Sequence, residues 1–235
     1  MKIREVFHAY KSILVPCLFI FLGITLMFAA SSLFLELAEG ILEKDTFALD
    51  EAILSFFQLV EQPFLTTLFS FITELGSIWF ITLITIFLSL YYWKKEQDVI
   101  VAIFVIIASA GGGILILLLK YIFQRERPSH APEYDGSGFS FPSGHALGSF
   151  IIYGFIIYLL FKEKRYMKTR ILLMASLLLL IICIGLSRVY LHVHYPTDII
   201  AGYSIGLIWL ICCIFSMNLS KVYSRKVTRV NSLKK

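Results

Sequence analysis

Charged residues are scarce in this sequence. Only 16% of its 235 residues are Asp, Glu, Lys or Arg, and 58% are hydrophobic, whereas a soluble domain has about 25% charged residues and is roughly half apolar. This balance excludes an ordinary soluble domain. It predicts an integral membrane protein whose apolar surface is completed by lipid.

Cysteine is also rare, and every cysteine lies within an apolar run, where a disulfide framework or a zinc site is not expected. We interpret the four as small hydrophobic residues: Cys17, Cys183, Cys212 and Cys213. The net charge of +5 comes from basic residues spread over short segments between apolar runs, not from one soluble patch. Nucleic acid is therefore not an expected partner.

Six apolar runs approach the ~20 residues that cross a hydrocarbon core of ~30 Å. Helix is the expected structure because unsatisfied backbone groups are costly in lipid, and the alternation of a membrane β-barrel is absent. The first run is too long for the core of a cleavable signal peptide. We predict an all-α, six-span membrane protein that forms one domain over residues 1–235, with spans near 13–35, 77–93, 99–119, 145–161, 171–187 and 197–217.

Basic residues predict the orientation of the spans. They gather in the two terminal tails, at 94–95 and within 161–170, which six spans place on one face. We expect that face and both termini to be cytoplasmic. The opposite face is acidic, because residues 36–76 hold eight acids and one lysine. The basic residues that break this bias need another reason to be there: Lys120, Arg125, Arg127 and Arg188.

The first outer loop, residues 46–73, mixes acids with Phe, Leu and Ile at roughly helical spacing. It predicts two short amphipathic helices, split at Pro63, that lie in the membrane interface. They form either a cap over the bundle or a wall that guides a lipid-borne substrate into a site.

Three segments bring ionisable residues to the predicted outer face. In KYIFQRERP, Lys120 and Arg127 are seven residues apart, so they share a helix face if the helix continues to Pro128. Snorkelling interfacial anchors are an equal alternative for this pair. In FSFPSGH, Ser143 is an N-cap candidate and Gly144 allows close approach to the backbone. His145 is then either an interfacial polar residue or part of an anion site at the helix start.

The third segment is SRVYLHVHYPTD, residues 187–198. Pro196 suits the first position of a helix, and Asp198 then lies in the first turn. The spacing of four lets Asp198 orient the ring of His194, as a nucleophilic or general-base histidine requires. His192 is too distant in sequence for the same carboxylate, so we interpret it as a loop or interfacial residue.

Together the segments predict a site for a compact anion with several charges, and phosphate fits best. Arginine holds phosphate in a bidentate manner and lysine acts as a point charge. No acidic cluster suited to magnesium is evident in the sequence. The bases would then supply the electrostatic stabilisation that phosphoryl transfer needs.

These residues resemble the signature of the type 2 phosphatidic acid phosphatase superfamily, K-x6-RP, PSGH and SR-x5-H-x3-D, at every position. The resemblance implies a phosphohistidine on His194, oriented by Asp198, with His145 as the proton donor. It also implies that no metal or other cofactor is needed. The residues it assigns to the phosphoryl oxygens are Lys120, Arg127, Ser143, Gly144 and Arg188. Arg125 lies outside the pattern, and we interpret it as a contact to a lipid headgroup in preference to a second phosphate.

The plan looks most like the bacterial phosphatidylglycerophosphatase B group, so the expected reaction releases phosphate from phosphatidylglycerophosphate. Hydrolysis of undecaprenyl pyrophosphate, or of several lipid phosphates, is the nearest alternative. Two other classes stay open: a transporter or proton relay, and a metal site built from His145, His192, His194 and Asp198.

Overall fold

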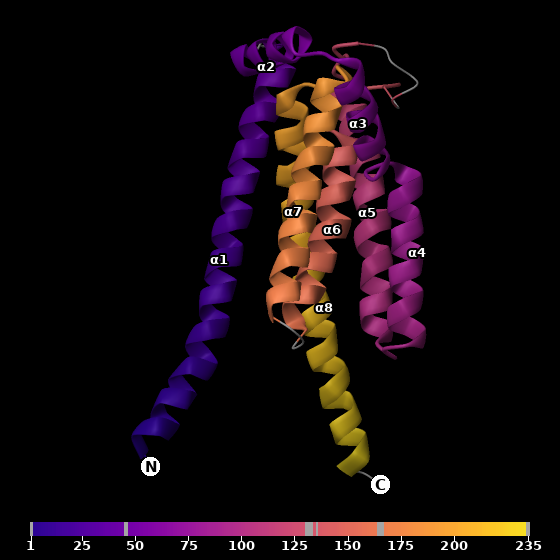
Figure 1. Ribbon diagram of the computed structural model, residues 1–235. Helices are drawn as coiled ribbons and strands as arrows, with labels where there is room; N and C mark the ends of the chain where they lie inside the picture. The colour runs from indigo at the N-terminus through magenta and orange to yellow at the C-terminus, as the bar shows by residue number, and fades with distance from the viewer. Residues whose placement is uncertain (1, 45–46, 130–133, 135, 164–166, 234–235) are drawn as a thin grey trace.

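The computed structural model describes residues 2–44, 47–129, 134, 136–163 and 167–233, and these residues contain helices and no strand. Figure 1 shows a bundle of long helices, with two short helices, α2 and α3, at one end and both chain termini at the other. The helices are α1 (Lys2–Leu42), α2 (Ala48–Leu59), α3 (Pro63–Glu74), α4 (Ile78–Lys94), α5 (Val99–Phe123), α6 (Gly144–Lys162), α7 (Met167–Tyr190) and α8 (Pro196–Leu233).

The all-α membrane fold predicted from composition is confirmed. Five helices (α1, α5, α6, α7 and α8) are each long and apolar enough to cross a membrane, and α3 with α4 adds a sixth span if that pair, bent by 42°, is counted as one. The first predicted span, 13–35, lies entirely within α1, and among the described residues the apolar part of that helix continues to Leu42. α8 continues to Leu233 because no proline or glycine interrupts the polar sequence that follows its span.

The predicted split of the first outer loop is also confirmed. Pro63 occupies the first turn of α3, where its missing N–H costs nothing. Both helices are amphipathic, but each buries a polar residue on its inner face. Asp50 of α2 and Thr73 of α3 are each only 2% exposed. These two side chains contact the candidate site described below.

Close packing of α6 against α8 brings two helix N-termini together. Gly202 lies so near the start of α6 that an added Cβ would stand 2.8 Å from the Ser143 carbonyl oxygen. Gly206, one turn later, is similarly close to Phe150. The Ser143 N–H donates to the Asp198 carbonyl at 3.0 Å. The starts of α6 and α8 are therefore joined directly through their backbones.

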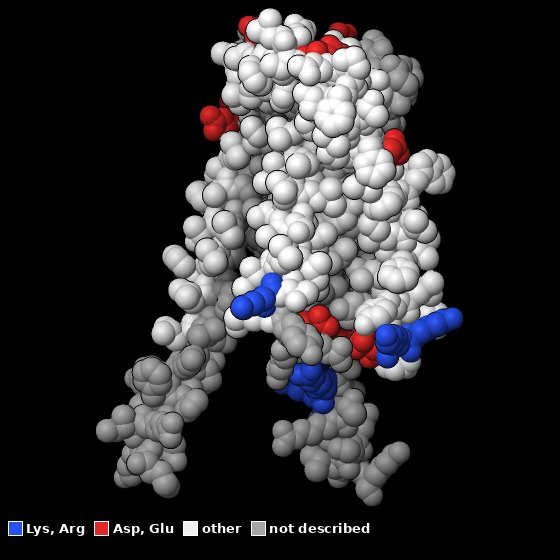
Figure 2. Space-filling view, in the orientation of Figure 1, with Lys and Arg blue, Asp and Glu red and all other residues white. Residues whose placement is uncertain are grey.

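Figure 2 shows acidic side chains at the α2–α3 end of the bundle and both basic and acidic side chains at the opposite end. Among the described residues, the exposed acidic side chains in or next to α1, α2 and α3 are Glu36, Glu39, Glu43, Glu51, Glu61 and Glu74. Lys94 ends α4 and Lys162 ends α6 at the opposite end, where the exposed acids Glu96 and Glu163 follow them in sequence. The side chains of residues 1–13, 164–166 and 227–235, which include several bases used to predict the orientation, lie outside the described part of the structure.

Candidate active site

Two helix starts define one side of the candidate site. Ser143 is the N-cap of α6, as predicted, and its hydroxyl accepts from the Ala146 N–H at 3.4 Å. His145 follows in the first turn and is 7% exposed. α8 begins at Pro196, which was also predicted, and places the fully buried Asp198 in its first turn. The two N-termini lie together, so each brings the positive end of a helix dipole to the same region.

His194 and Asp198 face each other across the start of α8. The distance from His194 Nδ1 to Asp198 Oδ2 is 3.3 Å, and the Tyr195 N–H donates to the same oxygen at 2.9 Å. On the other side of the ring, Nε2 lies 3.1 Å from Arg127 Nη1. A guanidinium can only donate, so we assign the lone pair to Nε2 and the proton to Nδ1. This tautomer points a nucleophilic nitrogen away from Asp198 and towards the cations.

The environment of His194 keeps its ring neutral. Burial lowers the pKa of His194 well below its usual value, and the positive charges of Arg188, Arg127 and Lys120 lower it further. Desolvation disfavours the charged ring, and nearby cations act in the same direction. A neutral imidazole is the form that can attack phosphorus.

Arg127 is fixed by backbone carbonyls. It donates to Val193 O at 2.7 Å, to Ser137 O at 2.9 Å and to Gly138 O at 3.0 Å. The expectation that Lys120 and Arg127 share one helix face is wrong. α5 ends at Phe123, because Gln124 adopts a left-handed conformation with φ 46°. Arg127 reaches His194 from the following loop instead.

Arg188, near the end of α7, is completely buried, and its Nη1 donates to Thr73 Oγ1 at 2.8 Å. A buried guanidinium needs such partners, because desolvation of an uncompensated charge is costly. Thr73 was not recognised from the sequence, since nothing in its local pattern separates it from the other threonines of α3.

The sequence suggested that Arg125 contacts a lipid headgroup, but in the structure its two terminal nitrogens contact acidic side chains. Its Nη1 donates to Asp198 Oδ1 and its Nη2 to Asp50 Oδ2, each at 2.7 Å. The side chain is only 15% exposed. The opposite charges of two buried carboxylates therefore hold it inside the protein.

His192 lies in the turn between α7 and α8, with φ 53°. Its carbonyl accepts from the Ser129 hydroxyl at 2.7 Å. The loop position expected from the sequence is confirmed. Within the described ranges no three His, Cys, Asp or Glu side chains gather as metal ligands would.

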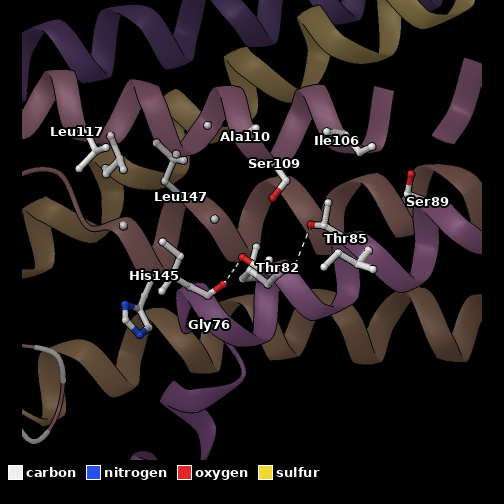
Figure 3. Close-up of a pocket in the computed structure, with 18 of the residues that line it drawn as sticks. Gly76, Thr82, Thr85, Ser89, Ile106, Ser109, Ala110, Leu117, His145 and Leu147 are labelled. Carbon is white, nitrogen blue, oxygen red and sulfur yellow. Dashed lines mark hydrogen bonds between the residues drawn. The ribbon is translucent and has the colours of Figure 1, made fainter. Parts of the chain in front are cut away.

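A groove of about 730 Å³ leads away from the site between α4, α5 and α6. Gly76, Lys120, Gly144 and His145 line one end of it, and Figure 3 shows the remaining lining residues running from His145 towards Ser89. The walls are mainly Ile, Leu and small residues. Thr82 and Thr85 add hydroxyls, but each donates to a carbonyl of its own helix. An apolar chain could therefore lie in the groove without leaving these two hydroxyl donors unsatisfied.

Fold and site together define a polytopic membrane protein that holds a buried histidine and carboxylate among cations. Residues 98–221 match the PAP2 superfamily. The chain is 33% identical to phosphatidylglycerophosphatase B of Bacillus subtilis over 180 residues, which are 74% of this chain and 86% of the relative. This protein belongs to the PAP2 superfamily.

Other relatives agree with this assignment. Lipid A 4'-phosphatase of Porphyromonas gingivalis is 35% identical over 100 residues, or 38% of this chain and 39% of the relative. The crystal structure of a transmembrane PAP2-type phosphatidylglycerolphosphate phosphatase from Bacillus subtilis aligns with a TM-score of 0.66 at 29% identity, covering 86% of this chain and 96% of that one. Aquifex aeolicus LpxE aligns with a TM-score of 0.56 at 26% identity, covering 72% and 96%.

Proposed function

We propose that this protein is a membrane lipid phosphatase that hydrolyses phosphatidylglycerophosphate to phosphatidylglycerol and phosphate. One observation carries the proposal: a neutral, buried imidazole, held between Asp198 and Arg127, lies within a cation cluster to which an apolar groove leads. The cations suit the phosphate, and the groove suits the lipid chain. The similarity to phosphatidylglycerophosphatase B supports the choice of lipid.

The reaction would proceed in two displacements. His194 Nε2 attacks phosphorus, the bond from phosphorus to the glycerol oxygen breaks, and His145 donates a proton to that leaving oxygen. Asp198 holds the Nδ1 proton and stabilises the positive charge that develops on the ring. Water then attacks the phosphohistidine while His145 accepts its proton. Phosphate leaves, and His194 and His145 return to their starting states.

The phosphoryl oxygens would be held by Lys120, Arg127, Arg188 and the N-terminus of α6. Ser143 and Gly144 begin that helix, and the space around Gly144 is open, since an added Cβ would meet only Ile116 at 3.6 Å. Backbone N–H groups can thus approach an anion without a side chain in the way. Preorganised donors of this kind stabilise charge that develops in the transition state.

The groove favours a lipid over a soluble phosphate ester. From Lys120 to Ile106 it follows fourteen residues of α5, or roughly 21 Å at the helical rise. Half of a hydrocarbon core of ~30 Å is shorter than that. Several lining residues, including Ile78 and Leu117, are largely exposed on the outer surface of the bundle. A chain could therefore enter from the bilayer.

We also propose that the protein lies in the cell membrane with both termini in the cytoplasm and the site on the extracytoplasmic face. The ends of α4, α6 and α8 that lie opposite α2 and α3 carry the bases Lys94, Lys162 and Lys221. Lys and Arg near span ends favour the cytoplasm.

Undecaprenyl pyrophosphate is the second candidate substrate. The groove has no feature that selects an acyl chain over a prenyl chain, and relatives named for another lipid, lipid A, match part of this chain. Both lipids would present a phosphoryl group to the same cations.

The test uses purified protein in detergent, with no ion gradient, and measures phosphate released from each lipid and from glycerol 3-phosphate as a soluble control. We expect the highest kcat/KM on phosphatidylglycerophosphate, full activity in excess chelator, and none in His194→Ala. Faster release from undecaprenyl pyrophosphate would transfer the assignment to that lipid. No release from any lipid would overturn the proposal and return a transporter to consideration.

A further inference from the structure

Arg125 and Asp50 form a buried ion pair beside the catalytic carboxylate. Arg125 lies two residues after the end of α5, and its two terminal nitrogens reach different acids, Asp198 on α8 and Asp50 on α2. Its guanidinium stacks over the Tyr195 ring at 4.0 Å from the ring centroid. A planar group that donates on two sides and stacks on a third has little freedom to move.

Asp50 is itself tied to the start of α8. Its Oδ1 accepts from the Thr197 N–H at 2.9 Å, and its Oδ2 accepts from the Thr197 hydroxyl at 2.7 Å. The same hydroxyl accepts from Arg125 at 2.8 Å. α2 thus supplies a carboxylate to a helix N-terminus, where an anion is favoured. The loop after α5, α2 and α8 meet in one closed hydrogen-bond network.

The two carboxylate oxygens of Asp198 contact different partners in this network. Oδ1 accepts from Arg125, whereas Oδ2 accepts from the Tyr195 N–H and faces His194 Nδ1. With Oδ1 occupied, the carboxylate cannot rotate without breaking a charge-assisted bond. Burial raises the pKa of Tyr195, which lies beside this network. Burial alone would lower the pKa of Arg125, but the charges of Asp198 and Asp50 outweigh it, so the pKa of Arg125 is raised. The guanidinium therefore remains a permanent positive charge.

Charge balance gives Arg125 a second effect. Asp50 and Asp198 are both buried and share one cation. Without that cation, two carboxylates near each other in a poorly solvated place would not both stay ionised. A protonated Asp198 could no longer stabilise positive charge on His194.

We propose that Arg125, anchored by Asp50 of α2, is a positioning residue that keeps Asp198 ionised and aimed at His194. The interfacial helix α2 is then part of the catalytic apparatus. The inference rests on the proposed function. Arg125 acts through Asp198 and not on the substrate, so its loss should change kcat far more than KM.

The experiment compares Arg125→Met with Arg225→Met, a control at an exposed position of α8, on the best lipid substrate. We expect kcat to fall ~100-fold in Arg125→Met while KM stays within about threefold, since loss of the orienting acid of a triad costs up to ~10⁴-fold. Arg225→Met should match the wild type. Added guanidinium should restore part of the kcat of Arg125→Met and leave the wild type unchanged.

A second substitution separates positioning from structural support. Asp50→Asn in the Arg125→Met background removes one of the two competing carboxylates, so we expect kcat to rise several-fold above that of Arg125→Met. If Arg125→Met does not fold, Arg125→Lys replaces it, and its kcat should be intermediate because one ammonium cannot bridge both acids.

Unchanged kcat, a rise in KM alone, or a further loss of kcat on adding Asp50→Asn would overturn the positioning role while the wild type still releases phosphate. If the wild type releases none from any lipid, the proposed function fails instead.

Discussion

Two groups of segments surround His194, and they differ in how openly the sequence displays them. The signature segments, residues 120–128, 142–145 and 187–198, carry dense ionisable residues at fixed spacing. The region of α2 and α3, residues 48–74, shows only an amphipathic pattern. Yet Asp50 and Thr73 of that region contact Arg125 and Arg188 directly. In the proposed function the signature segments supply the groups that contact the substrate, and α2 and α3 supply contacts that hold two of the arginines in place.

This comparison predicts unequal effects of substitution. Removing the group that bonds to phosphorus should abolish the reaction. Removing a contact made by α2 or α3 should lower kcat/KM only by the free energy of one buried hydrogen bond.

His194→Ala should remove turnover completely, because no other side chain would form the phosphoenzyme. Phosphate release and trapping of phosphohistidine after an acid-free quench both measure it, and thermal unfolding in detergent verifies the fold. Residual turnover above one part in a thousand would point to a different nucleophile.

His145→Ala should lower kcat by ~10²–10³-fold on phosphatidylglycerophosphate, in the range for general acid catalysis. The loss should be smaller on undecaprenyl pyrophosphate, whose leaving group is a phosphate and needs less protonation. Parallel assays on the two lipids check this. Equal losses on both would argue against proton donation by His145.

Thr73→Val tests the contribution of α3, because valine keeps the shape of threonine and removes the oxygen that accepts from Arg188. Leaving a buried charged donor without that partner costs about 1–2 kcal/mol, or roughly 5–30-fold in kcat/KM. Thr67→Val is the matched control, because that exposed hydroxyl of α3 only donates to Pro63 O. Similar kcat/KM values for the two variants would show that the contact from α3 does not contribute to catalysis.

His194 should become protonated at a lower pH than an ordinary histidine. Its pKa in the folded protein lies well below the usual value, chiefly through burial. The ring therefore stays neutral as pH falls through ~6.5, while the unfolded chain already binds the proton there, so the folded state loses stability below that pH. The ¹⁵N-histidine signal that disappears in His194→Ala should stay in its neutral position at pH 6. A midpoint at or above the usual value would contradict this assignment.

His192→Ala should have the smallest effect, leaving kcat/KM within about twofold of the wild type. Its contact to Ser129 is made by the backbone carbonyl, which alanine retains. The same phosphate assay applies. A loss as deep as that of His194→Ala would show that the nucleophile was assigned to the wrong histidine.

Local signals in the sequence predicted much of this structure. Pro63, Ser143 and Pro196 mark helix starts through backbone chemistry that acts within a few residues, and His194 and Asp198 lie on either side of the start of α8. The end of α5 was missed because the left-handed residue there, Gln124, belongs to no type that favours this conformation strongly.

Long-range pairing could not be predicted in the same way. Arg125 and Asp50 are 75 residues apart, and Arg188 and Thr73 are 115 apart. Such contacts depend on how α2 and α3 fold back over the bundle. Amphipathic periodicity shows which face of a helix is apolar, but it does not show which polar residue on that face will meet a distant arginine.

The acidic end of the bundle has a consequence for selectivity. Glu51, Glu61 and Glu74 are exposed in the region of α2 and α3, the two helices that supply Asp50 and Thr73 to the site. A phosphate dianion that approached this end of the bundle from bulk water would be repelled by these acids. A headgroup delivered along the bilayer plane by its own lipid tail avoids much of that barrier. Discrimination against dissolved phosphate esters would thus operate on the rate of encounter, independently of how tightly the pocket binds.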